Sequence, residues 1–176
     1  MRYASIRSMD ISNGEGIGVA LFVQGCHFRC NNCFNPETWD FNGGQEYTPQ
    51  IHKKFMELID RPYIKRVSIL GGEPLCDENA LDILTVVTDI KENFPSKKIW
   101  IYSGYTYDEI YSLHNNSVGD VYRREIMRYI DVLVDGRFLD FQKDISIKWK
   151  GSRNQNVIDM FETRRLGKMV FYSEQP

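Results

Sequence analysis

Short apolar runs alternate with longer amphipathic segments along most of this chain. The first run, residues 18–23, is almost continuously apolar, as expected for a strand covered on both faces. Similar runs at 67–70, 99–102 and 130–134 predict three further strands. The pattern therefore predicts a sheet whose central strands are buried.

The segments between these runs have the spacing of helices. Thr48 and Pro49 form an N-cap and first turn, followed by apolar residues at helical spacing, namely Ile51, Phe55, Leu58 and Ile59. A second helix is expected to be capped by Asp77 and to bury one stripe, formed by Ala80, Ile83, Leu84, Val87 and Phe94. Residues 106–129, including His114, are expected to be helix and loop. The order βαβαβαβ predicts a parallel sheet with right-handed crossovers, either open or curled into a barrel.

The unusual residues of the chain follow the predicted strands. They occupy positions 26–33, 71–74, 103–105 and 135–137, each directly after one apolar run. Parallel α/β folds gather their chemistry at the carboxyl ends of the strands. We therefore expect these four segments to form one site.

Composition limits the size of the fold and the class of partner. With 176 residues, of which 42% are hydrophobic and 26% charged, the chain is expected to form a single domain, residues 1–176, with no element assigned beyond about residue 160. Lysine and arginine total 22 against 24 acidic residues, a net charge of -2. This balance gives no reason to expect a nucleic acid as partner.

The N-terminal residues and the cysteines indicate the compartment. Residues 1–5 lack the regions of a secretory signal, and no apolar run is long enough to span a membrane. Three of the four cysteines fall within eight residues, which suits metal ligation better than a disulfide framework. We expect a cytoplasmic protein that does not associate with membranes.

The three clustered cysteines have the spacing C-x3-C-x2-C, formed by Cys26, Cys30 and Cys33. Three thiolates on a [4Fe-4S] cluster leave one iron open to an external ligand, and that iron can chelate the amino and carboxylate groups of S-adenosylmethionine (SAM). A zinc site completed by His27 or Cys76, and a chance cluster of buried thiols, are the alternatives. Cys76 is expected to be a buried thiol or a loop residue.

Two further segments could contact such a ligand. Paired glycines before Glu73 permit close approach to the backbone, although a strand-to-helix turn alone would also favour them. Asp135 could bind ribose hydroxyls or the methionine ammonium, and Arg137 the methionine carboxylate. The alternative for Asp135 is a turn or cap at the end of a strand.

Taken together, these residues resemble the radical SAM superfamily and, within it, the activating enzymes of anaerobic ribonucleoside-triphosphate reductase. The matching segments span most of the chain and are Asp10-Ile11 with Asn13-Gly14 and Gly16, Leu21-Phe22-Val23 with Gly25-Cys26, Cys33-Phe34-Asn35 with Thr38-Trp39, Gly71-Gly72-Glu73-Pro74-Leu75, Ser103-Gly104-Tyr105, Val132-Leu133-Val134-Asp135-Gly136, and Gly151-Ser152 with Asn154-Gln155. The chain departs from the family in having Asn32 before the third cysteine, where an aromatic residue is common. It also lacks the arginine that often follows the first glycine turn.

The resemblance implies a fold and a set of site residues. The fold would be a partial (β/α) barrel of about five to six mostly parallel strands, because a full barrel needs roughly 250 residues. The cluster would be held by Cys26, Cys30 and Cys33. SAM would be bound by Asn32, Cys33, Phe34, Gly72, Glu73, Ser103, Asp135 and Arg137.

The resemblance also implies an activity. Reductive cleavage of SAM would yield a 5'-deoxyadenosyl radical that takes a hydrogen from a glycine of the reductase, with flavodoxin or ferredoxin as the electron donor. The first alternative is a radical SAM enzyme acting on a small molecule, similar to 7-carboxy-7-deazaguanine synthase. The second is a non-catalytic iron-sulfur protein.

Overall fold

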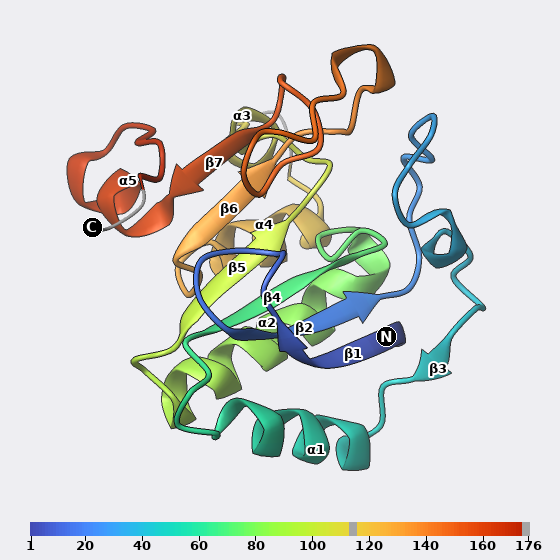
Figure 1. Cartoon of the computed structure of the whole chain (residues 1–176), viewed down its shortest axis with the longest axis vertical. Helices are drawn as coiled ribbons and strands as arrows, with labels where there is room; N and C mark the ends of the chain where they lie inside the picture. The colour runs from blue at the N-terminus through green and yellow to red at the C-terminus, as the bar shows by residue number, and fades with distance from the viewer. Residues whose placement is uncertain (113–115, 174–176) are drawn as a thin grey trace.

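The computed structural model describes residues 1–112 and 116–173 (Figure 1). A seven-stranded sheet, in the order β3-β1-β2-β4-β5-β6-β7, lies at its centre. The strands are β1 (Arg2–Asp10), β2 (Gly18–Val23), β3 (Gln45–Glu46), β4 (Arg66–Gly71), β5 (Lys98–Tyr102), β6 (Val132–Asp135) and β7 (Asn156–Asp159). The fold is therefore mixed α/β.

The four predicted strands form the parallel centre of this sheet. Strands β2, β4, β5 and β6 pair in parallel, with Val19 opposite Val67 and Val67 opposite Ile99. The predicted bounds of β2 are confirmed, whereas β6 begins two residues later than expected, at Val132. The reason is Asp131, whose carboxylate accepts hydrogen bonds from the backbone N–H of Ile99 and from Lys91.

The outer strands correct the expected strand number and add antiparallel pairings. In the part of the chain that the structure describes, seven strands are present instead of five or six. The pairings of β1, β3 and β7 are antiparallel, so the sheet is mixed around a parallel centre. Strand β1 reads RYASIRSMD and is largely solvent-facing, so it has no apolar run. Strands β3 and β7 are short, with two and four residues. Such edge strands carry little hydrophobic signal.

The helices cover one face of the sheet. They are α1 (Pro49–Ile59), α2 (Asp77–Asn93), α3 (Tyr107–Tyr111), α4 (Val118–Ile126) and α5 (Met160–Leu166). The main core joins α1, α2 and α4 to alternate residues of the strands, such as Leu21, Ile69 and Ile101. The intervening residues, including Phe22, Leu70 and Trp100, face the opposite side and form two smaller clusters. This second face of the sheet carries the site.

The ends of the helices follow the capping rules in most places. The Thr48 hydroxyl accepts the N–H of Ile51, as predicted. The N-cap position of α2 is Cys76, whose side chain makes no capping hydrogen bond, and Asp77 is the first residue of the helix. Asp77 instead lies in the first turn, where a carboxylate favours the helix dipole. In the segment 106–129, capping boxes start α3 and α4, while residues 113–115, with His114, lie outside the described residues.

The C-terminal segment returns to the sheet. After α5, Phe171 forms an isolated antiparallel bridge with Ile158 of β7. Of the described helices, none has the length and apolar character needed to cross a membrane.

Candidate functional site

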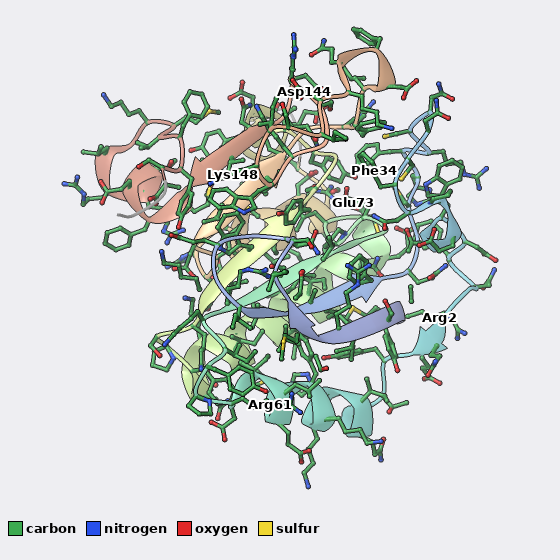
Figure 2. The ribbon with its side chains drawn as sticks, viewed as in Figure 1. Arg2, Phe34, Arg61, Glu73, Asp144 and Lys148 are labelled. Atoms are coloured by element: carbon green, nitrogen blue, oxygen red, sulfur yellow. The ribbon has the colours of Figure 1, made fainter. Side chains whose placement is uncertain are left out.

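A cavity of about 810 Å³ opens at the carboxyl ends of the parallel strands. The predicted site residues that line it are Cys26, Cys30, Cys33, Phe34, Gly72, Glu73, Ser103 and Arg137. Figure 2 labels Phe34 and Glu73, which belong to the loops after β2 and β4. Asn32 and Asp135 are not among the lining residues. The structure therefore brings together segments that are far apart in the sequence.

The cysteine loop is tied at its base. The N–H of Gly25 donates to the carbonyl of Thr38 at 2.8 Å, and the N–H of Cys26 donates to the carbonyl of Trp39 at 3.1 Å. Within the loop, Arg29 and Asn32 adopt left-handed backbone conformations, with φ of 47° and 54°. These bonds and turns hold the three cysteines, all partly buried, along one wall of the cavity.

The surroundings of the thiols determine how readily they lose their protons. Burial raises the pKa of the Cys26 and Cys30 thiols, although backbone N–H groups at Phe28 and Arg29 oppose the shift at Cys26. The positive charge of Arg137 lowers the pKa of Cys30 in part. Iron must therefore displace protons from these thiols when it binds.

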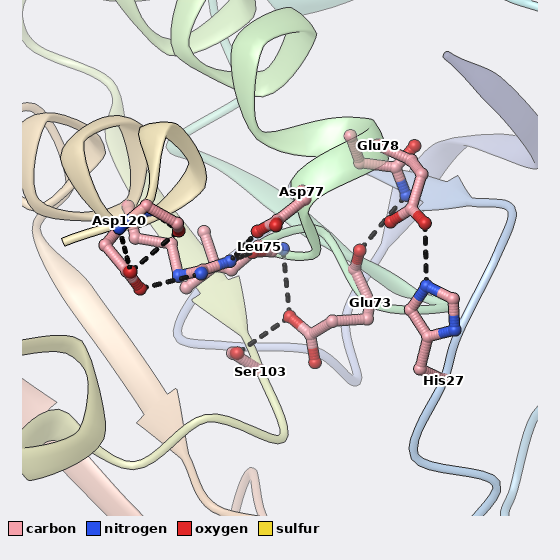
Figure 3. Close-up of polar contacts among 10 residues, drawn as sticks. His27, Glu73, Leu75, Asp77, Glu78, Ser103 and Asp120 are labelled. Carbon is pink, nitrogen blue, oxygen red and sulfur yellow. Dashed lines mark hydrogen bonds and ion pairs between the residues drawn. The ribbon is translucent and has the colours of Figure 1, made fainter. Parts of the chain in front are cut away.

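Neither proposed fourth ligand reaches the cavity. His27 Nε2 lies 2.7 Å from Glu78 Oε1 (Figure 3). The centroid of the His27 ring is 4.5 Å from that of Phe41. Cys76 is buried beneath the first turn of α2, and burial raises the pKa of its thiol. Neither residue lines the cavity.

The three loop cysteines line the same cavity, and neither His27 nor Cys76 does. Three thiolates without a fourth cysteine fit a [4Fe-4S] cluster, in which each thiolate binds a different iron. The assignment of the cluster to these three residues stays a prediction.

The glycine turn after β4 packs directly against the base of the cysteine loop. Gly72 donates its N–H to the carbonyl of Val23 at 2.9 Å, and Glu73 donates to the carbonyl of Gly25 at 2.7 Å. Gly71 has a φ of 104°, a conformation that favours glycine. A Cβ on Gly72 would lie 2.4 Å from the carbonyl oxygen of Gly25. The two loops therefore approach each other more closely than a side chain at Gly72 would allow.

The carboxylate of Glu73 connects the turns after β4 and β5. One oxygen accepts from the Ser103 hydroxyl at 2.7 Å and from the N–H of Leu75 at 2.9 Å (Figure 3). The other oxygen accepts from the N–H of Gly104 at 2.7 Å. Burial raises the pKa of Glu73 to about 7, despite these three hydrogen bonds. The hydrogen bonds between Glu73 and the 103–104 turn hold the loops after β4 and β5 together in the cavity wall.

The raised pKa of Glu73 predicts a pH-dependent stability. The folded protein keeps a proton on Glu73 up to pH about 7, whereas the unfolded chain releases it near 4.5, so this stabilisation is present below pH 4.5 and is lost as the pH rises through 7. Relative to Glu73→Gln, the wild type should lose about 2 to 3 kcal/mol between pH 5 and 8. Urea unfolding of both cluster-loaded proteins without oxygen measures this difference. Parallel pH profiles for the two proteins would contradict it.

Aromatic and cationic side chains form the rest of the wall. The Arg137 guanidinium lies 4.4 Å from the centroid of Phe28, a ring that also contacts Tyr105. Phe34 packs against Phe138, with ring centroids 5.0 Å apart. Arg137 and Phe34 both line the cavity, and their contact with SAM stays a prediction.

Asn32 and Asp135 are held by other parts of the chain. Asn32 donates from Nδ2 to Asp140 at 2.9 Å. Asp135 is buried and accepts from the N–H of Tyr107 and from the N–H and side-chain amide of Asn156. Its carboxylate thus connects β6 to α3 and β7, as in the strand-end alternative, and its contact with SAM stays a prediction.

Some residues that build the cavity were not assigned to the site from the sequence. Gln155 accepts from the N–H groups of Gly151 and Ser152 and donates to the carbonyl of Gly136, so it braces the turn before Arg137. Residues 145–151 also line the cavity. The apolar positions Ile145, Ile147 and Trp149, alternating with polar residues, are the sequence signal that could have indicated a buried or binding segment here.

Comparison with known proteins agrees with this geometry. The family model described as a 4Fe-4S single cluster domain matches residues 12–158, which include the three loop cysteines. Anaerobic ribonucleoside-triphosphate reductase-activating proteins from Salmonella typhi and Escherichia coli K12 are each 37% identical to this chain over 159 residues, covering 89% of this chain and 97% of theirs. The protein of that name from Enterobacteria phage T4 is 34% identical, with 89% and 93% covered. The chain therefore belongs to the family of anaerobic ribonucleoside-triphosphate reductase-activating proteins.

Proposed function

We propose that this chain activates an anaerobic ribonucleoside-triphosphate reductase by forming a glycyl radical in it. The observation that carries the proposal is the cavity itself, where three cysteines without a fourth cysteine ligand meet the glycine turn after β4. The relatives are named as activating proteins of this reductase, which supports activation of the reductase. Their names do not favour a small-molecule radical SAM enzyme or a non-catalytic iron-sulfur protein.

Cys26, Cys30 and Cys33 would hold the cluster. A cluster bound there would supply the one-electron chemistry that cleaves SAM, with the electron coming from the external donor, and the 5'-deoxyadenosyl group so released would accept the hydrogen of a glycine in the partner. The task of the chain is to position both reactants and to exclude water and competing reactions.

The cavity residues have separate roles in this proposal. Gly72 offers backbone at close range to the methionine end of SAM, where Arg137 supplies a cation for the carboxylate. Phe34 presents its ring to the adenine, with Asn32 fixing the loop beside it through Asp140. Glu73 and Ser103 keep the wall in place, since their side chains already bond to each other.

Asp135 would act mainly by positioning the end of β6. Its three hydrogen bonds fix the end of β6, from which Gly136 and Arg137 reach the cavity. The remaining features belong to the same proposal: a partial radical SAM barrel formed by the sheet, flavodoxin or ferredoxin as electron donor, and a cytoplasmic location. Free thiols that must stay reduced are consistent with that compartment.

The experiment that tests this function uses the partner protein. With SAM, a chemical reductant and the reductase from the same cell, the reconstituted chain is expected to produce an oxygen-sensitive glycyl radical on the reductase. Electron paramagnetic resonance should show a doublet from the remaining α-hydrogen, and samples without SAM should show none. If SAM is cleaved, a small molecule is consumed and the reductase acquires no radical, the small-molecule alternative is correct.

A further inference from the structure

The connection between β6 and β7 carries the most exposed large apolar side chains of the described residues. We name residues 138–153 the β6–β7 lobe. Phe141 is 82% exposed and Ile145 is 81% exposed. The two positions are four residues apart, and large apolar side chains exposed together beside a functional cavity commonly mark an interaction site.

The backbone of the lobe is well fixed. Lys143 and Ser152 form an antiparallel bridge, and flanking hydrogen bonds join Asp144 N–H to Gly151 C=O at 3.0 Å and Arg153 N–H to Gln142 C=O at 2.9 Å. The two apolar side chains therefore stand on an ordered support. A preorganised surface loses little conformational entropy when it binds.

The lobe is continuous with the mouth of the cavity. Ile145 itself lines the cavity, and Asn32 of the cysteine loop bonds to Asp140 of the lobe. The Lys143 ammonium lies 5.3 Å from the ring centroid of Phe34. In Figure 1 the orange lobe after β6 and the blue loop after β2 rise from the same end of the sheet, and Figure 2 labels Asp144 and Lys148 on the lobe.

The charge of the lobe differs in sign from that of the whole chain. It contains four cations, at Lys143, Lys148, Lys150 and Arg153, and two carboxylates, at Asp140 and Asp144, for a formal charge of +2, against -2 for the chain. A partner that fits this surface would present an apolar groove with carboxylates at its edge.

We propose that the β6–β7 lobe is the surface on which the reductase docks, with Phe141 and Ile145 entering an acidic-rimmed apolar groove next to its target glycine. The inference rests on the proposed function. A hydrogen transfer requires the glycine to be held in contact at the cavity, so the docking surface must adjoin its mouth. Electron transfer does not require such contact, and an electron donor can approach the cluster from the outer side of the cysteine loop. The location of the lobe therefore favours the reductase over the electron donor.

The test compares two single variants of the full chain loaded with its cluster. Phe141→Ser changes a residue that does not line the cavity, and it should lower both affinity for the reductase and glycyl-radical yield at least tenfold, because aromatic anchors dominate binding. SAM cleavage with a chemical reductant and no reductase should stay within about twofold of wild type. The matched control, Phe161→Ser, removes an exposed phenylalanine on α5 and should change neither measurement.

The outcomes separate this inference from the proposed function. Wild-type affinity and radical yield in the lobe variant would overturn the inference alone. Loss of its iron or of its reductase-independent SAM cleavage would also overturn it, since the lobe would then belong to the cofactor site. A defect seen only when flavodoxin replaces the chemical reductant would assign the lobe to the electron donor. A wild-type chain that cleaves SAM but never forms a radical on the reductase would instead overturn the proposed function.

Discussion

Replacing Cys26, Cys30 or Cys33 with alanine is expected to abolish cluster assembly and, with it, SAM cleavage. Each thiolate would bind a different iron, so the loss of one thiol leaves the cluster with only two cysteine ligands in this loop. Iron and sulfide content and the visible absorption after anaerobic reconstitution measure assembly directly. We expect each variant to retain little of the wild-type iron and no detectable SAM cleavage.

Cys76→Ala is the matched control for these three variants. Its thiol is buried at the N-cap of α2 and does not line the cavity. Removing it leaves a small void, which should cost about 1 kcal/mol of stability and leave the iron content near that of wild type. Loss of iron in Cys76→Ala would show that this thiol is a ligand after all.

The central strands of the sheet could be predicted from the sequence because strands buried on both faces consist almost entirely of apolar residues. Strand β2 consists of six buried residues, and its bounds were predicted correctly. Strand β1 was missed because exposed polar residues, such as Ser5, Arg7 and Ser8, interrupt its apolar positions. Antiparallel pairing by such strands depends on tertiary contacts, which no local pattern contains.

The site was predictable where its residues follow the predicted strands in sequence. The cysteines, Gly72, Ser103 and Arg137 each come shortly after a parallel strand, so the topology alone brought them together. Asp135 ends such a strand too, but its side chain points to partners on Tyr107 and Asn156. The direction of a side chain at the end of a strand depends on hydrogen-bond partners far away in sequence, and spacing cannot reveal it.

A substitution in the glycine turn after β4, Gly72→Ala, is expected to lower both the stability of the protein and the rate of SAM cleavage. Gly72→Ala would place a methyl group 2.4 Å from the carbonyl oxygen of Gly25 and 3.0 Å from that of Thr38, and both are backbone atoms. Backbone atoms cannot move aside as a flexible side chain can, so the turn must separate from the cysteine loop. The displacement should cost about 1 to 3 kcal/mol of stability. A shift on the order of 1 Å between SAM and the cluster should lower the rate of SAM cleavage about 100-fold.

Gly167→Ala distinguishes this clash from a general cost of replacing glycine. Gly167 ends α5 with a φ of 65°, and a Cβ there would meet no atom within 4 Å. The left-handed conformation should cost roughly 1 kcal/mol of stability and leave SAM cleavage unchanged. Thermal unfolding and single-turnover SAM cleavage, measured on both variants with full iron content, give the comparison. If Gly72→Ala cleaves SAM as fast as Gly167→Ala, the close approach of the two loops is not needed for the reaction.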